Sequence, residues 1–187
     1  DEPTSYSIGY GENPPAMGVD FFEGPYQDAD GIDNPLTEVF TDAIDSLGIP
    51  YDGIGIGYGD GVVDNERYGM RKFLYFNWNY GINGQPTLAS HYYNYMRGYW
   101  KNGQRMAYGG DGLNASTGAN LEIPADYMFP DDTDPYQWGT VGIPVEPWTE
   151  FQAGNPPGDR LFLQSAGPFT LEPGDYNNIT MGVVWAR

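Results

Sequence analysis

The stretch that decides the fold class is residues 179–186, Ile-Thr-Met-Gly-Val-Val-Trp-Ala, near the C-terminus. Large apolar residues occupy every second position from Ile179 to Trp185, which is the period of a β-strand with one apolar face. A short apolar segment, 169–171, leads toward it through Glu-Pro-Gly-Asp, where Pro and Gly favour a tight turn. The C-terminal part of the chain is therefore predicted to be β.

Outward from this stretch, two segments have helical spacing and several short runs have the composition of strands. The stronger helix signal, 34–48, starts with Asn34 as a cap and Pro35 at the first helical position, and ends at Gly48. The second, 88–99, places aromatic residues on one face. Strands are predicted at 70–78, 105–108, 127–129 and 160–164, whereas 51–61 is a Gly-rich loop and 1–34 carries little periodicity.

These elements predict a mainly β, β-sandwich-like and loop-rich fold with two short helices, and an α+β fold is the alternative. A length of 187 residues suits a single domain, 1–187. Aromatic residues make up 16% of the chain, which argues for a packed core despite 27 Gly and 16 Pro. Because the last strand runs up to the C-terminus, we expect the sequence to be a piece of a longer, multi-domain chain.

Charge and cysteine content exclude several classes of function. The net charge is −18, with eight Lys and Arg, so the chain is a poor partner for nucleic acid or for an anionic membrane surface. No run approaches the roughly 18 apolar residues of a membrane span, so no direct membrane insertion is expected. The absence of Cys excludes a disulfide scaffold, thiolate metal sites and Cys catalysis.

Two acidic, Gly-containing clusters are candidates for metal binding. Calcium takes six to eight oxygen ligands at flexible distances, and alternate carboxylates on a turn supply them. Neither cluster is a complete EF-hand loop, so each would need ligands from elsewhere in the chain. The alternative is that the acidic residues form ordinary turns, which Asp and Asn favour without a metal. The predicted calcium ligands are Asp28, Asp30, Asp33, Asn34, Asp60, Asp64 and Glu66.

The remaining titratable residues give little reason to predict an enzyme. A third acidic run contains Asp126, Asp131, Asp132 and Asp134 and is explained by turn chemistry around two Pro. His91 is the single His, and the chain has no Gly-x-Ser-x-Gly motif, so a Ser–His–Asp triad is not expected. With so many carboxylates, a pair at glycosidase spacing carries almost no information.

The aromatic residues are a second group of candidate binding residues. Trp78, Trp100, Trp138 and Trp148, together with the many Tyr, could form a platform on which sugars stack. The competing interpretation is that they fill the core or line a protein interface, where Tyr and Trp are common. For the Tyr residues of segment 88–99, helical spacing favours packing.

Several phrases of the sequence, in this order, resemble a domain found in large surface or secreted proteins exported by the type IX secretion system. They are GVDFFEGP (18–25), DADGIDNP (28–35), GDGVVDNER (59–67), YYNY (92–95), WKNG (100–103), YGG (108–110), YMFP (127–130), GDR (158–160), QSAGPFTLEPG (164–174) and VVWA (183–186). The family has Asp where this chain has Asn102, and Pro-Gly-Asp where it has Pro130-Asp131-Asp132. Acidic residues at these positions are therefore not an essential catalytic set.

The resemblance implies a location more than an activity: the cell surface or the extracellular space, in proteins with adhesion, gliding or filament roles. We therefore expect a non-enzymatic extracellular structural or interaction module of a large cell-surface or filament-forming protein, stiffened by calcium. Its expected partners are other protein subunits or neighbouring domains of the same chain, with glycans as a further class. The alternative function is a carbohydrate-binding module that uses exposed Trp and Tyr.

Overall fold

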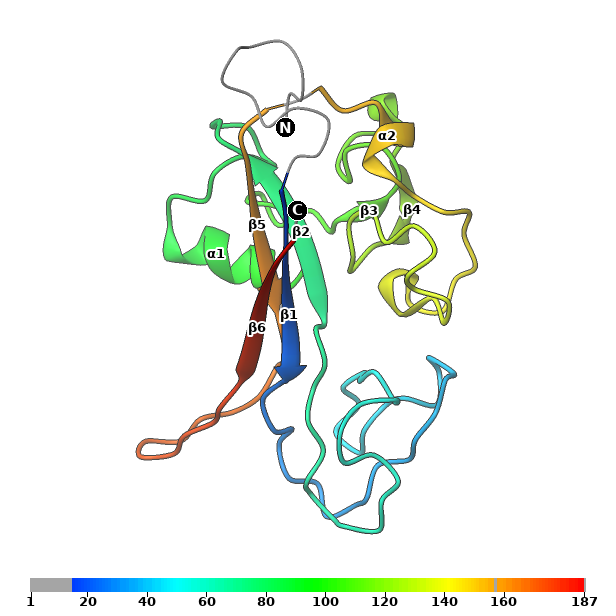
Figure 1. The fold of residues 1–187 in the computed structure, drawn as a ribbon, viewed down its shortest axis with the longest axis vertical. Coiled ribbons are helices and arrows are strands. Elements are labelled where there is room, and N and C mark those ends of the chain that lie inside the picture. The colour runs from blue at the N-terminus through cyan, green and yellow to red at the C-terminus, as the bar shows by residue number, and fades with distance from the viewer. Residues whose placement is uncertain (1–14, 157, 187) are drawn as a thin grey trace.

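The fold is mainly β and loop-rich with two short helices, as predicted (Figure 1). The structure, a computed structural model, describes residues 15–156 and 158–186. The elements in chain order are β1 (Ala16–Glu23), β2 (Lys72–Asn77), α1 (Ala89–Met96), β3 (Ala107–Tyr108), the 3-10 turn η1 (Ala115–Thr117), β4 (Asn120–Pro124), the 3-10 turn η2 (Trp138–Thr140), α2 (Glu150–Ala153), β5 (Arg160–Ser165) and β6 (Thr180–Ala186).

The strands form three two-stranded antiparallel sheets, β1 with β6, β2 with β5, and β3 with β4. The β2–β5 ribbon lies at the centre, with α1 on one side and β3, β4 and α2 on the other (Figure 1). Segment 24–71 forms the lower part of the molecule in this view and contains no named helix or strand. Neither helix of the described residues is long and apolar enough to cross a bilayer.

Two aromatic-rich clusters form the core. In β2, Leu74 and Phe76 are buried on one face, and Tyr95 of α1 and Trp100 pack against them. The remaining buried members of this first cluster are Met106, Leu113, Ala125, Met128 and Trp148. The second cluster organises segment 24–71 and its surroundings, and consists of Ala43, Tyr51, Tyr58, Tyr68 and Trp138. Within it, the rings of Tyr51 and Tyr58 are stacked with centroids 4.9 Å apart.

Most of the elements predicted after residue 70 are confirmed. The segments 70–78, 160–164 and 179–186 contain β2, β5 and β6, and 88–99 contains α1. The predicted strand 105–108 is reduced to β3. The prediction at 127–129 is wrong, although Tyr127 forms an isolated parallel bridge with Phe73 of β2.

The helix predicted over 34–48 is wrong, although its local signals are strong. The structure has a single turn around Val39–Ala43, and Gly48 has the expected left-handed φ of 81°. The backbone at the start of the segment is bonded to other loops instead: Thr37 N–H donates to Gly53 O at 2.7 Å. The apolar residues that would have formed the buried helix face are mostly exposed. Tertiary hydrogen bonds thus replace the helical ones.

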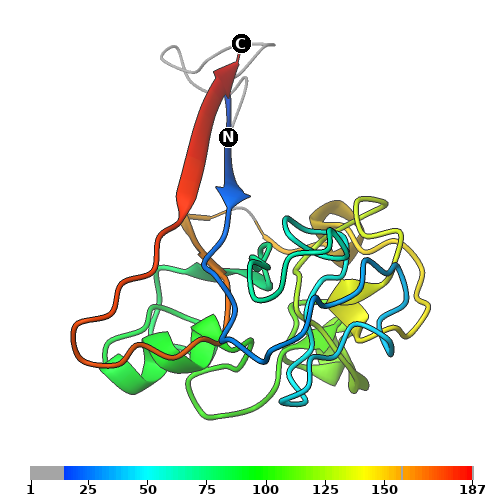
Figure 2. The ribbon, with the colours of Figure 1, turned by 90° about the horizontal axis from the view of Figure 1, so that it is seen from below.

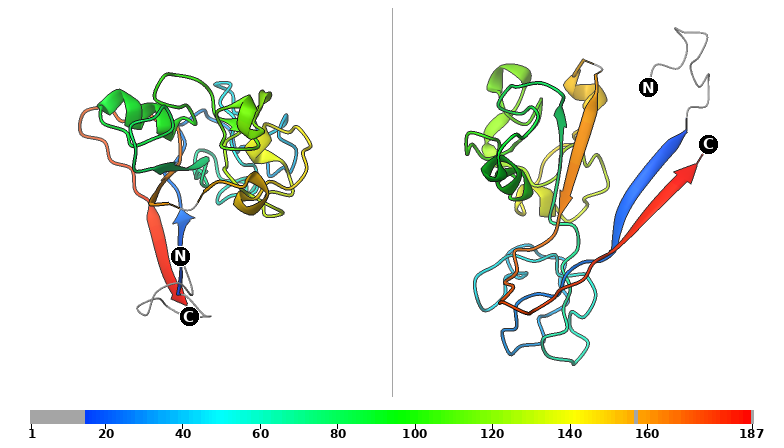
Figure 3. Two further views of the ribbon diagram at one scale, coloured as in Figure 1. Left: turned by 90° about the horizontal axis from the view of Figure 1, so that it is seen from above. Right: turned by 90° about the vertical axis from the view of Figure 1, so that its left-hand side faces the viewer.

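Strand β1 is not predicted from the sequence, because residues 1–34 as a whole carry little periodicity. Residues 1–14 lie outside the described part, but 16–23 pairs along its length with β6. The pairs Met17–Trp185, Val19–Val183 and Phe21–Met181 stand directly opposite one another. This β1–β6 ribbon projects away from the rest of the molecule (Figures 2 and 3).

Candidate functional site

The two acidic clusters, 28–34 and 59–66, lie side by side and are linked by hydrogen bonds in both directions. Asp33 accepts from the backbone N–H groups of Gly59 at 2.9 Å and Gly61 at 2.7 Å. In return, Asp64 Oδ1 accepts from the N–H groups of Asp30 at 2.7 Å and Gly31 at 2.8 Å. Loops that are distant in sequence therefore form one unit, called the paired acidic loops below (28–34 and 59–66).

A buried carboxylate closes this unit on its inner side. Glu66 is 2% exposed and accepts a hydrogen bond from the backbone N–H of Asn34, which is itself buried. Gly59 N–H donates to the carbonyl of Asn34 at 2.9 Å. Both backbone polar groups of Asn34 are thereby satisfied from the opposite loop, so the two loops must fold together.

Other carboxylates of the predicted metal set stabilise their own loops. Asp60 accepts from Val62 N–H at 2.8 Å and from the Asn65 amide at 3.0 Å. Asp30 accepts from the N–H groups of Ile32 at 2.9 Å and Ser46 at 3.2 Å. Burial acts to raise the pKa of Asp30, but these hydrogen bonds outweigh it and hold the pKa below 3.8.

Asp28, another predicted calcium ligand, contacts a segment outside the two acidic loops. Its two carboxylate oxygens accept from the N–H and the hydroxyl of Thr170, both at 2.7 Å. Asp28 therefore ties the first acidic loop to the chain between β5 and β6.

The acidic residues thus accept hydrogen bonds that stabilise turns, in agreement with the alternative interpretation. Across residues 15–156 and 158–186, no three His, Asp or Glu side chains converge as a metal-ligand group. Calcium binding stays a prediction. The ion pairs of the described chain involve Asp52, Asp126 and Glu150, so the carboxylates of the paired acidic loops are not neutralised by a Lys or Arg there.

Arg67, the basic residue next to Glu66, is directed toward neutral groups. Its guanidinium donates to Gly24 O at 2.8 Å and to the side chain of Asn178 at 3.0 Å. It also lies 3.9 Å from the centre of the Tyr26 ring. Arg67 therefore connects the end of β1 to the segment before β6.

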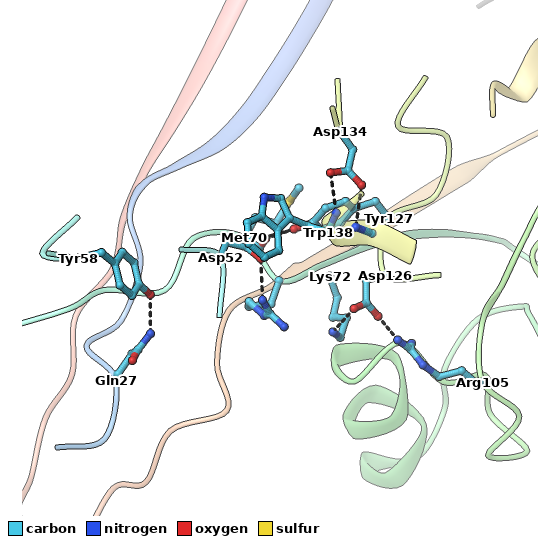
Figure 4. Close-up of polar contacts among 12 residues, drawn as sticks. Gln27, Asp52, Tyr58, Met70, Lys72, Arg105, Asp126, Tyr127, Asp134 and Trp138 are labelled. Carbon is cyan, nitrogen blue, oxygen red and sulfur yellow. Dashed lines mark hydrogen bonds and ion pairs between the residues drawn. The ribbon is translucent and has the colours of Figure 1, made fainter. Parts of the chain in front are cut away.

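A buried ionic network lies at the start of β2 (Figure 4). Asp126 forms ion pairs with Lys72 at 2.8 Å and with Arg105, and its side chain is 5% exposed. Asp52 pairs with Arg71 at 2.6 Å and accepts from the Tyr127 hydroxyl at 3.1 Å. Sequence reasoning missed this network, because its members come from segments with no shared motif.

The third acidic run divides into two roles. Asp126 belongs to the ionic network, whereas Asp134 accepts from the N–H groups of Trp138 at 2.9 Å and Gly139 at 2.7 Å, which holds η2 (Figure 4). The latter is the turn chemistry predicted from the sequence. His91 accepts at Nδ1 from Thr87 N–H at 3.3 Å, near the start of α1.

The tryptophans are divided between core and surface. Trp100, Trp138 and Trp148 are buried, so the interpretation that they fill the core is confirmed for these three. Trp78 is 61% exposed. On α1, Tyr95 is fully buried as packing predicts, while Tyr92 is exposed.

No protein-family model matches the chain, and no curated protein and no solved structure matches it. The resemblance to domains of proteins exported by the type IX secretion system therefore stays a prediction.

Proposed function

We propose that this chain is a non-enzymatic interaction module of a large extracellular, cell-surface or filament-forming protein, stiffened by calcium at the paired acidic loops. The proposal has two parts, an apolar surface that meets another protein subunit or a neighbouring domain, and a cation site that rigidifies the loops. Each part rests on a different region of the chain and has its own test.

The observation that carries the proposal is the apolar face of the β1–β6 ribbon, which is exposed except at the half-buried Val19 and Phe21. The cross-strand pairs Met17–Trp185, Val19–Val183 and Phe21–Met181 lie on one face, because opposed residues in an antiparallel pair point the same way. Met17 is 65% exposed and Trp185 is 67% exposed. A two-stranded ribbon is marginal in water, and a contiguous exposed apolar patch marks an interaction surface.

We expect the chain to self-associate through this face, a second copy serving as the other subunit, and the double variant Val183→Thr, Trp185→Thr to lose that association while keeping its fold. Both side chains are already exposed, so the thermal midpoint should move by less than about 2 °C. Burying a large apolar side chain at an interface contributes roughly 1.5–3 kcal/mol, so the association constant should fall at least about tenfold. Sedimentation velocity over a concentration series, with hydrogen exchange of the ribbon amides, measures both properties.

The control is Phe151→Gln, which removes an even more exposed aromatic side chain, 96% exposed, from α2. It should leave association unchanged. Wild-type chain that stays monomeric at millimolar concentration, with ribbon amides exchanging freely, would contradict self-association through this face.

The calcium part of the proposal rests on unneutralised charge. Asp33 and Asp64 cross between the paired acidic loops, and Asp30 and Asp60 lie within them. Like charges held close together repel, and a divalent cation relieves that repulsion in a chain of net charge −18. Their backbone hydrogen bonds leave carboxylate lone pairs available for a hard cation that prefers oxygen.

Calcium is expected to raise the thermal midpoint of the chain, and magnesium is expected to raise it less. A ligand that binds only the folded state stabilises it by about 4 kcal/mol at a thousandfold excess over Kd. Asp30→Asn combined with Asp60→Asn keeps the side-chain shapes and should abolish the calcium shift. Calorimetric melts in chelator, magnesium and calcium measure it.

The control Asp132→Ala with Asp159→Ala removes the same charge from exposed positions outside the loops and should retain the calcium shift. If the thermal midpoint is the same in chelator and in millimolar calcium, the loops are ordinary turns and the calcium proposal is wrong.

Carbohydrate binding is the second candidate function. It is favoured by the exposed rings of Trp78 and Tyr80, which follow β2 in a loop rich in Asn. Amide side chains beside aromatic faces are suited to sugar hydroxyl groups and sugar C–H faces.

A further inference from the structure

A cavity of about 820 Å³ gathers much of the positive charge of this acidic chain. It lies beside the C-terminal half of α1, the start of β2 and the chain that follows β5. Four of the eight basic residues in the sequence line it: Arg71, Lys72, Arg97 and Arg105. The volume is within the usual range for sites that bind small molecules.

The acidic residues in contact with these side chains neutralise them only in part. Lys72 and Arg105 share one carboxylate, that of Asp126, and Arg71 pairs with Asp52. Four basic against two acidic residues leave a local excess of two positive charges. Two further cavities differ: one of about 650 Å³ has Asp20 and Asp134 as its charged lining residues. One of about 200 Å³ is lined by Asp111 and Arg160, one of each sign.

Arg97 and Arg71 are the basic residues of the cavity with unused binding capacity. Arg97 is the exposed C-cap residue that follows α1, and it forms no ion pair among the residues that the structure describes. Its guanidinium lies 5.4 Å from the centre of the Tyr93 ring and 5.2 Å from that of Tyr99. Arg71 is more than nine-tenths buried, and its Nε has no hydrogen-bond partner.

Aromatic side chains supply the apolar part of the cavity wall. Tyr93, Tyr99, Phe40 and Phe169 line it together with the basic groups. Flat ring faces suit the C–H face of a pyranose, while guanidinium groups bind carboxylates through paired, charge-assisted hydrogen bonds. The same wall therefore fits a ligand that has both features in one ring.

We propose that this cavity binds a single carboxylate-bearing sugar, a uronate residue at the end of an otherwise neutral glycan. The carboxylate would meet Arg97 and Arg71, the two basic residues with unused binding capacity, and the ring would lie against Tyr93 and Tyr99. A single charge is specified because the rest of the chain carries strong negative charge and repels a continuous polyanion. At physiological salt, charges farther apart than about 8 Å are largely screened from each other. Acidic residues farther than this from the bound carboxylate therefore repel it only weakly.

This site does not depend on the ribbon or on calcium, but it defines a ligand class for the carbohydrate-binding alternative. Its test compares two sugars that differ only in the carboxylate, methyl glucuronide and methyl glucoside, by calorimetric titration into the full chain. We expect the glucuronide to bind at least about tenfold more tightly than the glucoside. Polygalacturonate of the same uronate concentration should bind no better than the monosaccharide.

Arg97→Gln should weaken glucuronide binding about tenfold without changing the thermal midpoint, because the side chain is exposed. Tyr93→Ala should weaken both sugars. The control Lys101→Gln removes a positive charge that lies outside the cavity, where its ammonium donates to Gln85 O at 3.1 Å, and should have no effect on binding.

Equal affinity for the two sugars, or full affinity in Arg97→Gln, would overturn the proposal, as would no binding at millimolar concentration. A blocked glutamate, acetyl-Glu-amide, which presents one side-chain carboxylate, is titrated in parallel. If it binds more tightly than the glucuronide, the cavity recognises a protein carboxylate and the sugar proposal is wrong. Association through the ribbon is measured separately, so either proposal can fail alone.

Discussion

Replacing Gly24 with Ala is expected to destabilise the fold by at least about 4 kcal/mol, a loss that is exceptional for a single substitution. A Cβ atom at this buried position would lie 1.6 Å from the carbonyl oxygen of Tyr68. Neighbouring pairing prevents relaxation, because Tyr68 N–H donates to Pro25 O at 2.9 Å and Gln27 N–H donates to Glu66 O at 3.0 Å. Urea unfolding followed by far-UV circular dichroism measures the loss.

The matched control lies within β1, the strand that ends just before Gly24. Gly18 is exposed on β1, and its Cβ would make an ordinary 3.4 Å contact with Val184. Gly18→Ala is therefore expected to change stability by less than about 0.5 kcal/mol. If Gly24→Ala proves as stable as Gly18→Ala, the close approach that joins the end of β1 to the paired acidic loops is wrong.

Replacing Asp126 with Ala is expected to cost about 3–5 kcal/mol, because it leaves two partly buried cations without their shared partner. Lys72 and Arg105 both pair with this carboxylate, and their side chains are only 16% and 26% exposed. Burial already lowers the pKa of Lys72, and the charge of Asp126 opposes that shift. Without Asp126 the pKa of Lys72 should fall further.

Two variants separate charge from packing at this position. Asp126→Asn keeps the shape and removes the charge, so a loss close to that of Asp126→Ala would assign the effect to electrostatics. Asp132→Ala changes an exposed carboxylate of the same acidic run and should be nearly neutral. If Asp126→Ala and Asp132→Ala unfold at the same urea concentration, the ionic network does not stabilise the fold.

Local sequence pattern predicted the strands well where apolar residues alternate. Residues 179–186 predict β6 because side chains at every second position share one face. The same period exists in β1, at Met17, Val19 and Phe21, and comparing these positions with the C-terminal strand would have found it. That β1 is the partner of β6 was not predictable, because the two are separated by almost the whole chain.

The segment 34–48 shows where local signals fail. Its cap, its Pro and its apolar spacing all favour a helix, but a helix of this length is marginal without a face to bury. Here Asn34 and Thr37 bond to the backbone of segment 53–59 instead. Competing tertiary hydrogen bonds therefore override the local preference.

The sequence by itself determined a mainly β, loop-rich chain with strong negative charge, acidic turns and many aromatic residues, because composition and period act over short distances. Tertiary structure alone decided which loops interlock, which Trp are buried, and that Asp126 serves two cations. It also decided that the apolar face of β6 is left uncovered and that half of the basic residues line one cavity. These features depend on contacts between segments far apart in the chain, and such contacts leave no periodic trace in the sequence.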